Sequence, residues 1–233
     1  IRDRAEKYQI PVLVQGDQYL ADCERTSVPF DFSKLSYRDY RLRRDALGGM
    51  DEYHRYSFTE NGISPLAVPG ESTHLVVVDS DEHDENGHII EDGETRNRMV
   101  DKRLHRKLRL LRQEISPPEL YGAENPEIIL IGYGSTHGVI KETVDHLSGS
   151  HAAAMLHFSE VYPFPLQDTF GYLEILQTAL HTLCIEQNAT GQFASLLHSE
   201  TGFSCSGRVN RYDGRPFTFD SLLNEISAHL KNS

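Results

Sequence analysis

Residues 127–147, EIILIGYGSTHGVIKETVDHL, decide the fold, because an apolar run leads through a glycine-rich turn into an amphipathic stretch. The run Glu127–Gly132 is almost continuously apolar, which is typical of a strand buried on both faces of a sheet. Apolar residues then recur at helical spacing up to position 147, and they predict a helix over His137–Leu147. The stretch therefore predicts a strand, a tight turn and a helix.

The same pattern recurs three more times toward the C-terminus. The expected strands are Ala153–Phe158, His181–Gln187 and Phe203–Asn210. The expected helices are Asp168–Ala179, Gly191–Glu200 and Asp220–Leu230. Repeated strand-then-helix units with apolar strands predict an α/β fold, in which a mostly parallel sheet carries helices on both faces. We assign this domain to residues 123–233.

Two other regions precede this domain. Residues 1–27 are interpreted as the end of a separate α/β domain, with a buried strand over Ile10–Val14 and a short helix after Asp17. The chain starts without a methionine, so we interpret it as a fragment or a processed chain. Residues 28–122 are less periodic and are expected to form an irregular linker.

The linker holds an acidic loop followed by a basic helix. Residues 79–94 include eight acidic residues and no Lys or Arg, whereas residues 96–112 include eight Lys or Arg and one acid. Apolar residues at helical spacing predict an amphipathic helix in this basic stretch. Its polar face either lies in solvent beside the acidic loop or contacts a partner subunit or a polyanionic ligand.

Composition excludes several classes of function. The 233-residue chain has a formal net charge of −12, which disfavours nucleic acid and anionic membrane surfaces as partners. No apolar run is long enough for a membrane span. The three cysteines, Cys23, Cys184 and Cys205, lie far apart, so this chain alone is not expected to hold an iron–sulfur cluster or a structural zinc ion. Such sparse cysteines fit a reducing cytoplasm.

Two turns at the carboxyl ends of predicted strands are candidate contact sites. Glycines allow the chain to turn tightly, and a helix that begins there can bind an anion. Each turn is interpreted either as structural capping or as a contact with an anion or another subunit. The candidate residues are Gly134, Ser135 and Thr136 in the first turn and Asn188, Thr190 and Gln192 in the second.

The acidic loop is the other candidate site. Its carboxylates and imidazoles could bind a divalent metal, but the EF-hand spacing is not met. The loop is therefore interpreted as solvated or as a gating or substrate-facing loop, and the candidates are Asp79, Asp81, Glu82 and His83. The chain shows no catalytic motif and no metal-binding motif, so we assign it no catalytic residue and no metal ligand.

Several motifs, in this order, resemble the α subunit of 2-oxoacid:ferredoxin oxidoreductases of the 2-oxoglutarate synthase type. They are AEKYQIPV (5–12) with DQYLAD (17–22), TENGISP (59–65) with AVPG (67–70), DEHDENGHI (81–89), MVDKR (99–103), GST (134–136), NATGQ (188–192) and YDGRPF (212–217). The resemblance covers nearly the whole chain. It implies that residues 1–27 end a pyrimidine-binding domain and that residues 123–233 are similar to the transketolase C-terminal domain.

The resemblance also implies the reaction and its partners. A 2-oxoacid, coenzyme A and oxidised ferredoxin give acyl-CoA, carbon dioxide and reduced ferredoxin. Thiamine diphosphate and Mg²⁺ would be shared with a β subunit that carries the iron–sulfur cluster, and this chain would bind no cofactor by itself. It would supply scaffold and subunit interface and would be inactive alone. The acidic loop with Asp79, Asp81, Glu82 and His83 would lie near the entrance for coenzyme A or substrate. The alternatives are another thiamine enzyme, of transketolase or 2-oxoacid dehydrogenase type, and a non-catalytic assembly module.

Overall fold

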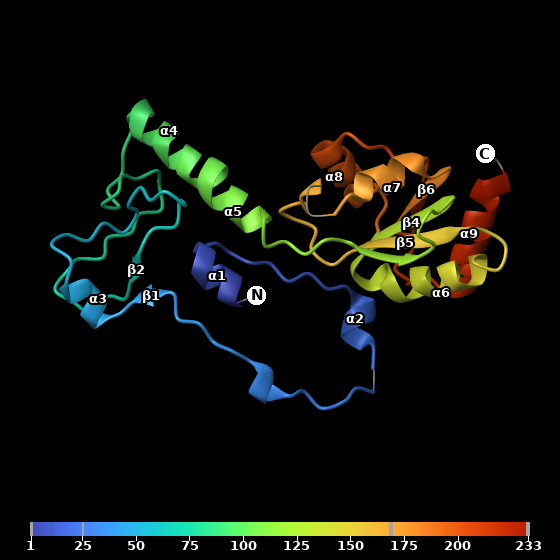
Figure 1. Ribbon diagram of the computed structural model, residues 1–233, viewed down its shortest axis with the longest axis horizontal. Coiled ribbons are helices and arrows are strands. Elements are labelled where there is room, and N and C mark those ends of the chain that lie inside the picture. Colours follow the sequence, from blue (N-terminus) through green and yellow to red (C-terminus); the bar gives the residue numbers. More distant parts are fainter. Residues whose placement is uncertain (1, 25, 168–169, 232–233) are drawn as a thin grey trace. The chain divides into compact units, whose positions relative to one another are not determined.

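The computed structural model describes residues 2–24, 26–167 and 170–231 and divides the chain into two compact units (Figure 1). Unit 1 comprises residues 1–14 and 26–111, and unit 2 comprises residues 15–25 and 112–233. Among the helices of the described residues, none has the length and apolar character needed to cross a bilayer.

Unit 2 is built on a five-stranded sheet in the order β3-β5-β4-β6-β7. Its strands are β3 (Glu119–Gly122), β4 (Ile128–Tyr133), β5 (Ala153–Phe158), β6 (His181–Glu186) and β7 (Gly207–Asn210). All pairs are parallel except β3 with β5. The mostly parallel sheet is thus confirmed. The antiparallel edge strand β3 was not predicted, because its four residues are too few to show a period.

Helices cover both faces of this sheet, as predicted (Figure 1). The helices of unit 2 are α2 (Gln18–Asp22), α6 (His137–Leu147), α7 (Tyr172–Thr178), α8 (Gln192–Thr201) and α9 (Phe219–Lys231), with a 3₁₀ turn, η3, at Gly134–Thr136. Helices α6 and α9 pack on one apolar core, and α7 and α8 pack on the core of the opposite face. Burial on both faces explains why the parallel strands are almost wholly apolar.

Two predicted bounds in unit 2 need correction. Helix α7 begins at Tyr172 rather than at Asp168, which lies outside the described residues, and Gly171 occupies its N-cap position. Strand β7 begins at Gly207, four residues later than predicted, where it pairs with Leu183 of β6. At β7 the apolar residues Phe203 and Cys205 continue the pattern beyond the backbone hydrogen bonds that define the strand.

Unit 1 has little regular structure. Its elements are α1 (Arg2–Tyr8), η1 (Phe32–Lys34), β1 (Arg41–Leu42), α3 (Arg44–Gly48), β2 (Leu66–Ala67), α4 (Gly93–Asp101) and the π-helix η2 (Lys102–Lys107), and α5 (Leu108–Arg112) follows at the boundary with unit 2. The parallel pair β1–β2 lies beside a small core around Leu47, Tyr53 and Ala67. This supports the prediction of an irregular region.

The strand predicted over Ile10–Val14 is wrong for the structure described. This segment is extended but belongs to no sheet, and the side chains of Leu13 and Val14 are exposed. Among the described residues, no neighbouring strand pairs with it, and an unpaired strand cannot satisfy its backbone N–H and C=O groups by itself. The apolar sequence pattern indicated the extended backbone but could not supply a partner.

The basic helix is present over residues 93–112, but it changes its winding in the middle. Asp92 caps its start by accepting a hydrogen bond from the backbone N–H of Thr95 at 2.8 Å. The π-helix η2 interrupts the α-helical winding between Asp101 and Leu108. Sequence period alone did not reveal this change, although π-helical turns are common at functional sites.

Candidate functional site

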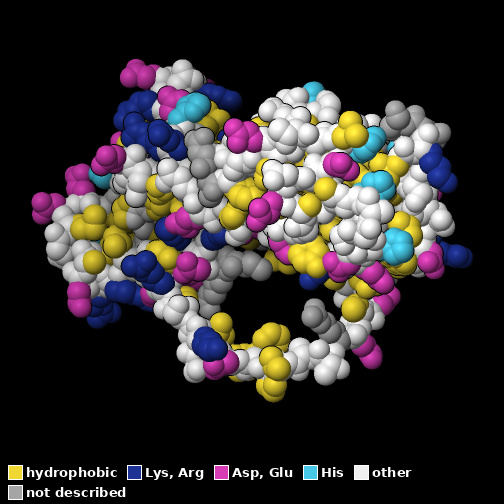
Figure 2. All heavy atoms as spheres, turned by 45° about the vertical axis from the view of Figure 1, so that its right-hand side comes forward, with side chains coloured by type: hydrophobic (Ala, Val, Ile, Leu, Met, Phe, Trp, Pro, Cys, Tyr) yellow, Lys and Arg dark blue, Asp and Glu magenta, His cyan; other side chains and the backbone are white. Residues whose placement is uncertain are grey.

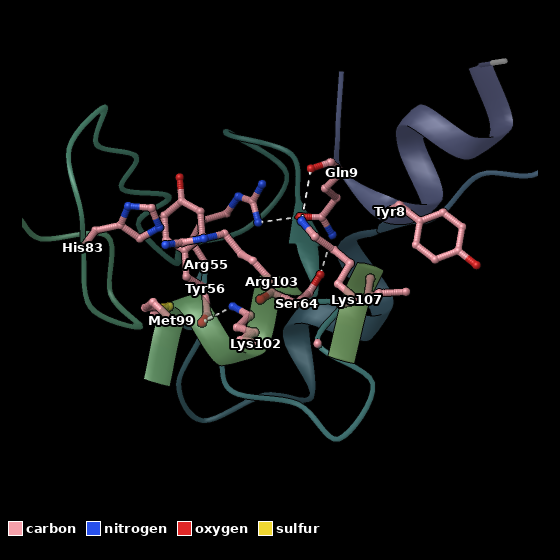
Figure 3. A pocket seen from close by; sticks show the side chains of 12 residues that line it. Tyr8, Gln9, Arg55, Tyr56, Ser64, His83, Met99, Lys102, Arg103 and Lys107 are labelled. Atoms are coloured by element: carbon pink, nitrogen blue, oxygen red, sulfur yellow. Dashed lines mark hydrogen bonds between the residues drawn. The ribbon is translucent and has the colours of Figure 1, made fainter. Parts of the chain in front are cut away.

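A cavity of about 210 Å³ lies within unit 1 (Figure 3). It is lined by Tyr8, Gln9, Arg55, Tyr56, Gly62, Ile63, Ser64, His83, Met99, Lys102, Arg103 and Lys107. The residues come from the end of α1, the loop over 55–64, the acidic loop and the helix that contains η2. Segments far apart in the sequence therefore build it jointly.

The lining is strongly cationic. It includes Arg55, Lys102, Arg103 and Lys107 and no Asp or Glu. Of these four, only Arg103 forms an ion pair with a carboxylate among the described residues: its two terminal nitrogens donate to Glu82 at 2.9 and 2.7 Å. Like charges gathered in a small space repel one another, so the arrangement favours an anionic ligand.

Lys102 is the most buried of these cations. Its side chain is 6% exposed, and its Nζ donates to the backbone oxygen of Tyr56 at 2.6 Å (Figure 3). Burial, followed by the neighbouring charges of Lys107 and Arg55, lowers the pKa of Lys102 to about 8. Burial, followed by Arg103 and Arg55, also lowers the pKa of Lys107. Both ammonium groups therefore lack full electrostatic compensation.

Gly62 shapes the helix side of the cavity. Its φ is +75°, and a Cβ added there would lie 2.6 Å from the carbonyl oxygen of Lys102 and 2.8 Å from the backbone nitrogen of Lys107. The loop backbone thus rests directly against the π-helical turn, which only glycine allows. This contact brings the TENGISP motif against the basic helix, two segments that sequence analysis had noted separately.

Gln9 joins two walls of the cavity. Its side-chain nitrogen donates to the backbone oxygen of Ser64, and its side-chain oxygen accepts from Arg55 at 2.7 Å (Figure 3). Its backbone has a φ of +50°, which is uncommon outside glycine. Among the described residues other than glycine, it alone has a positive φ. The side chain of Gln9 thereby orients the Arg55 guanidinium.

Of the four acidic-loop candidates, His83 lines the cavity, and Glu82 contacts Arg103 of its lining. Glu82 pairs with Arg103, and the ring of His83 packs on Tyr56 with centroids 3.8 Å apart. Asp79 instead accepts from the backbone N–H of Asp81, and neither of these residues lines the cavity. The basic helix and the acidic loop are therefore partly paired.

The two candidate turns of unit 2 meet at the edge of the sheet. Strand β4 lies between β5 and β6, so the chain reverses its direction of winding beside the carboxyl ends of β4 and β6, where α/β sheets commonly bind ligands. Ser135 follows β4, and Gln187 follows β6. The carboxylate of Asp17 lies there, accepting hydrogen bonds from Ser135 Oγ and, at 2.8 Å, from Gln187 Nε2. A carboxylate of the chain itself thus occupies this edge.

Of the other turn candidates, Thr136 and Asn188 form hydrogen bonds to backbone groups of their own turns. Thr136 is buried, occupies the N-cap position of α6 and donates to the carbonyl of Tyr133, but its side chain makes no capping hydrogen bond to the helix. Asn188 Oδ1 accepts from the backbone N–H groups of residues 190, 191 and 192 at 3.1, 2.8 and 3.2 Å. The side chains of Thr190 and Gln192 are exposed. Gly134 turns the chain with a φ of +60°.

Sequence reasoning missed most of the cavity. Single cations such as Arg55 carry no motif, and their convergence depends on how distant segments pack. The π-helical turn of Lys102 and the Asp17–Gln187 contact also left no local signal. Among the described residues, no group of three His, Cys, Asp or Glu side chains is close enough to hold a metal ion.

Comparison with known proteins gives relatives over nearly the whole chain. The α subunit of 2-oxoacid:ferredoxin oxidoreductase 1 from Sulfurisphaera tokodaii is 29% identical over 98% of this chain and 35% of the relative. The α subunit of 2-oxoacid:ferredoxin oxidoreductase 2 from Aeropyrum pernix is 32% identical over 91% of this chain and 33% of the relative. The chain thus spans about a third of the length of these curated relatives.

Two further comparisons add detail. The 2-oxoglutarate synthase subunit KorA of Methanothermobacter thermautotrophicus is 26% identical over 95% of this chain and 57% of the relative. The solved 2-oxoglutarate:ferredoxin oxidoreductase from Magnetococcus marinus, with 2-oxoglutarate, coenzyme A and succinyl-CoA bound, matches with a TM-score of 0.83 and 26% identity, over 98% of this chain and 39% of that chain. No family model matches the chain.

Proposed function

We infer from the family to which this chain belongs, that of the α subunits of 2-oxoacid:ferredoxin oxidoreductases, that it forms part of an enzyme that oxidatively decarboxylates a 2-oxoacid. The products are acyl-CoA, carbon dioxide and reduced ferredoxin. The observation that carries this proposal is the joint match in sequence and structure over 98% of the chain to an enzyme solved with 2-oxoglutarate and coenzyme A. The favoured substrate is 2-oxoglutarate.

The cationic cavity is proposed as the binding site for the 2-oxoacid. Its volume of about 210 Å³ is below the usual range of about 300–1,000 Å³ for drug-sized ligands, so it suits a small acid better than coenzyme A. Arg55 presents a guanidinium whose partner is the neutral Gln9, so its charge is available to a carboxylate. Ser64 adds a hydroxyl to the same lining.

The acidic loop is proposed to control entry to this cavity. Glu82 already holds Arg103, and His83 forms part of the wall, while Asp79 and Asp81 extend the same loop. A carboxylate beside the entrance repels a misplaced anion and competes with the substrate for Arg103. The loop therefore favours anions whose attraction to Arg55 offsets this repulsion.

The cofactors are assigned to sites completed by other parts of the enzyme. The described residues offer no set of metal ligands, and the three cysteines are free and lie far apart in the sequence. These donors do not fit Mg²⁺ or an iron–sulfur cluster, so we assign thiamine diphosphate with its Mg²⁺ to a site shared with a β subunit, which carries the cluster. No reaction step is derived through them. Free cysteines also support a reducing cytoplasm as the location.

The domain assignment follows the family. Residues 1–27 end a pyrimidine-binding domain, residues 28–122 form the linker, and residues 123–233 form a domain similar to the transketolase C-terminal domain. The exposed apolar side chains of Leu13 and Val14 support this assignment, because a sheet elsewhere in the enzyme would bury them. The turn containing Gly134 and Ser135 and the turn at Asn188 remain candidates for an anion or subunit contact.

An exposed apolar arm supports a role in subunit assembly. We use "arm" for residues 26–36, all of which are exposed. Phe30 and Phe32 are 81% and 74% exposed, their ring centroids lie 6.5 Å apart, and Val28 and Leu35 extend the same segment. Figure 2 shows hydrophobic side chains along the extended segment at the bottom of the view. Single exposed apolar residues are common, but an exposed aromatic cluster marks an interaction site. The partner is the β subunit, since the relatives are named as α subunits.

The test uses the full-length protein produced together with its β subunit. The expected result is reduction of ferredoxin or viologen that requires both 2-oxoglutarate and coenzyme A, with succinyl-CoA and carbon dioxide released. Arg55→Met should raise the KM for 2-oxoglutarate by about tenfold or more, because a charge-assisted hydrogen bond is lost. Arg109→Met is the matched control, since Arg109 is an exposed cation of the same helix. Transfer of the acyl group to a sugar without coenzyme A would contradict the proposal.

A further inference from the structure

Lys102 is buried among cations without a counter-ion. Arg103, Lys107 and Arg98 come from its own helix, and Arg55 comes from the facing loop. On the acidic loop Glu85 partly offsets this charge, and His83 lines the same cavity. Tyr8 and Tyr56 complete the titratable groups around it. No described carboxylate lies within ion-pair distance of Lys102. A buried charge in this position tends to lose its proton unless an anion binds.

The π-helical winding of η2 positions Lys102 at the cavity. In a π-helix the backbone hydrogen bonds join residues five apart, so Lys102 and Lys107 lie on the same face of η2. In an α-helix the same spacing would turn them to different faces. Gly62 packs against the carbonyl of Lys102 and the N–H of Lys107, which keeps this winding in contact with the cavity loop. Both ammonium groups are thereby presented to one cavity.

We propose that Lys102 binds the carboxylate of the 2-oxoacid together with Arg55, and that the bound anion is the counter-ion which this lysine lacks in the free protein. The inference rests on the proposed function, because it takes the 2-oxoacid as the ligand of this cavity. Lys102 thereby makes substrate affinity depend on pH above neutrality, and Lys107, whose pKa burial also lowers, adds to this dependence. Arg55 and Arg103 keep their charge over the same range.

The direction of this dependence follows from linkage. The pKa of Lys102 in the free protein lies at about 8. Below that pH the ammonium form is already present, so the KM stays constant. Above it the free protein must take up a proton before the ligand binds equally well, so the KM rises by up to about tenfold per pH unit. The kcat need not change, because the effect concerns binding.

The experiment measures kcat and KM for 2-oxoglutarate between pH 7 and about pH 9.5 in the complete enzyme. In the wild type the KM should rise above about pH 8. Lys102→Arg keeps a charge that does not titrate, so most of the rise in KM above about pH 8 should be lost, whatever the KM at pH 7. Lys102→Met should raise the KM at pH 7 by about tenfold or more and remove most of its pH dependence. Arg109→Met should behave as the wild type, because Arg109 lies outside the cavity.

Three results distinguish failure of the proposed function from failure of the inference about Lys102. If the wild-type enzyme does not turn over a 2-oxoacid, the proposed function fails. If it does, but Lys102→Arg shows the same rise in KM as the wild type, this inference alone is overturned. An unchanged KM in a folded Lys102→Met enzyme overturns it as well. Thermal unfolding monitors folding, and removal of an uncompensated buried charge should not lower the Tm. If Lys102→Met fails to fold, the pH profile of Lys102→Arg decides.

Discussion

The carboxylate of Asp17 accepts a hydrogen bond of 2.8 Å from Gln187, a residue 170 positions further along the chain. Ser135 donates to the same carboxylate, and Gln187 also donates to Ser135 at 2.9 Å. The contact holds residues 15–25 at the carboxyl edge of the sheet, within unit 2. It brings together two motifs of the family, DQYLAD and GST, at the position where related sheets bind ligands.

Asp17→Ala should lower the free energy of unfolding of unit 2 by about 1–2 kcal/mol, because three donors lose a charged acceptor: Ser135, Gln187 and the backbone N–H of Leu20, through which Asp17 caps α2. Urea unfolding of the chain, followed by circular dichroism, measures the change. Asp22→Ala is the control: Asp22 accepts a hydrogen bond from Gln18 at the surface, and its loss should cost less than about 0.5 kcal/mol. Equal losses in the two variants would show that the Asp17 contact contributes nothing specific.

Gly62→Ala should destabilise unit 1 by about 2 kcal/mol or more, because strain at a positive φ adds to a collision with the π-helical backbone. Gly70→Ala is a matched control, since Gly70 has a φ of +84° but open space around its Cα. Its cost should be about 1 kcal/mol. The difference in denaturant midpoint between the two variants isolates the contact with η2. A smaller effect at Gly62 than at Gly70 would contradict this account.

The pair between Glu82 and Arg103 should make the stability of unit 1 depend on acidity. The hydrogen-bonded guanidinium of Arg103 lowers the pKa of Glu82 below its ordinary value of 4.5, although burial opposes this shift. A lowered carboxylate pKa adds stability at higher pH, which is lost as the pH falls below 4.5 through the folded-state pKa. Glu82→Gln should therefore be less stable than the wild type near neutral pH, by about 0.5–1 kcal/mol, since Arg103 is partly exposed.

The difference between Glu82→Gln and the wild type should shrink as the solution is acidified and vanish once Glu82 is protonated. Denaturant titrations at several pH values give this difference directly. Glu91→Gln, which changes an exposed acid of the same loop region, should show no such dependence. A constant difference across the range would mean that the ion pair is not its source.

Phe30→Ser combined with Phe32→Ser should weaken assembly of the full-length protein with its β subunit. Each buried phenylalanine contributes about 1.5–3 kcal/mol, so the dissociation constant should rise by about a hundredfold or more. Analytical ultracentrifugation of the complex measures the change. Leu75→Ser is the control, because Leu75 is 82% exposed outside the arm.

A photo-reactive residue at position 30 identifies what covers the arm. Cross-linking to the β subunit supports the proposed interface. Cross-linking to a second α subunit, or to another part of the same chain, would replace the β subunit as the occupant. If the double variant assembled with an unchanged dissociation constant, the arm would not be part of the interface.

The sequence predicted well those parts of the fold that depend on local pattern. Strands β4 and β5 are almost wholly apolar runs, and α6 and α9 repeat apolar residues at helical spacing. Such patterns reflect burial on one or both faces, which each segment encodes by itself. The strand expected over Ile10–Val14 failed for the complementary reason: a strand needs a neighbour, and the described residues provide none.

The sequence by itself determined the parallel α/β architecture, because the spacing of apolar residues within each segment reflects its secondary structure and its burial. It also singled out Glu82, His83 and Ser135, which lie in recognisable loops. Only the tertiary structure decided that Arg55, Lys102 and Lys107 line one cavity and that Asp17 meets Gln187. The physical reason is that charge accumulates in a site through the packing of distant segments and the winding of a π-helix, and neither leaves a local period in the sequence.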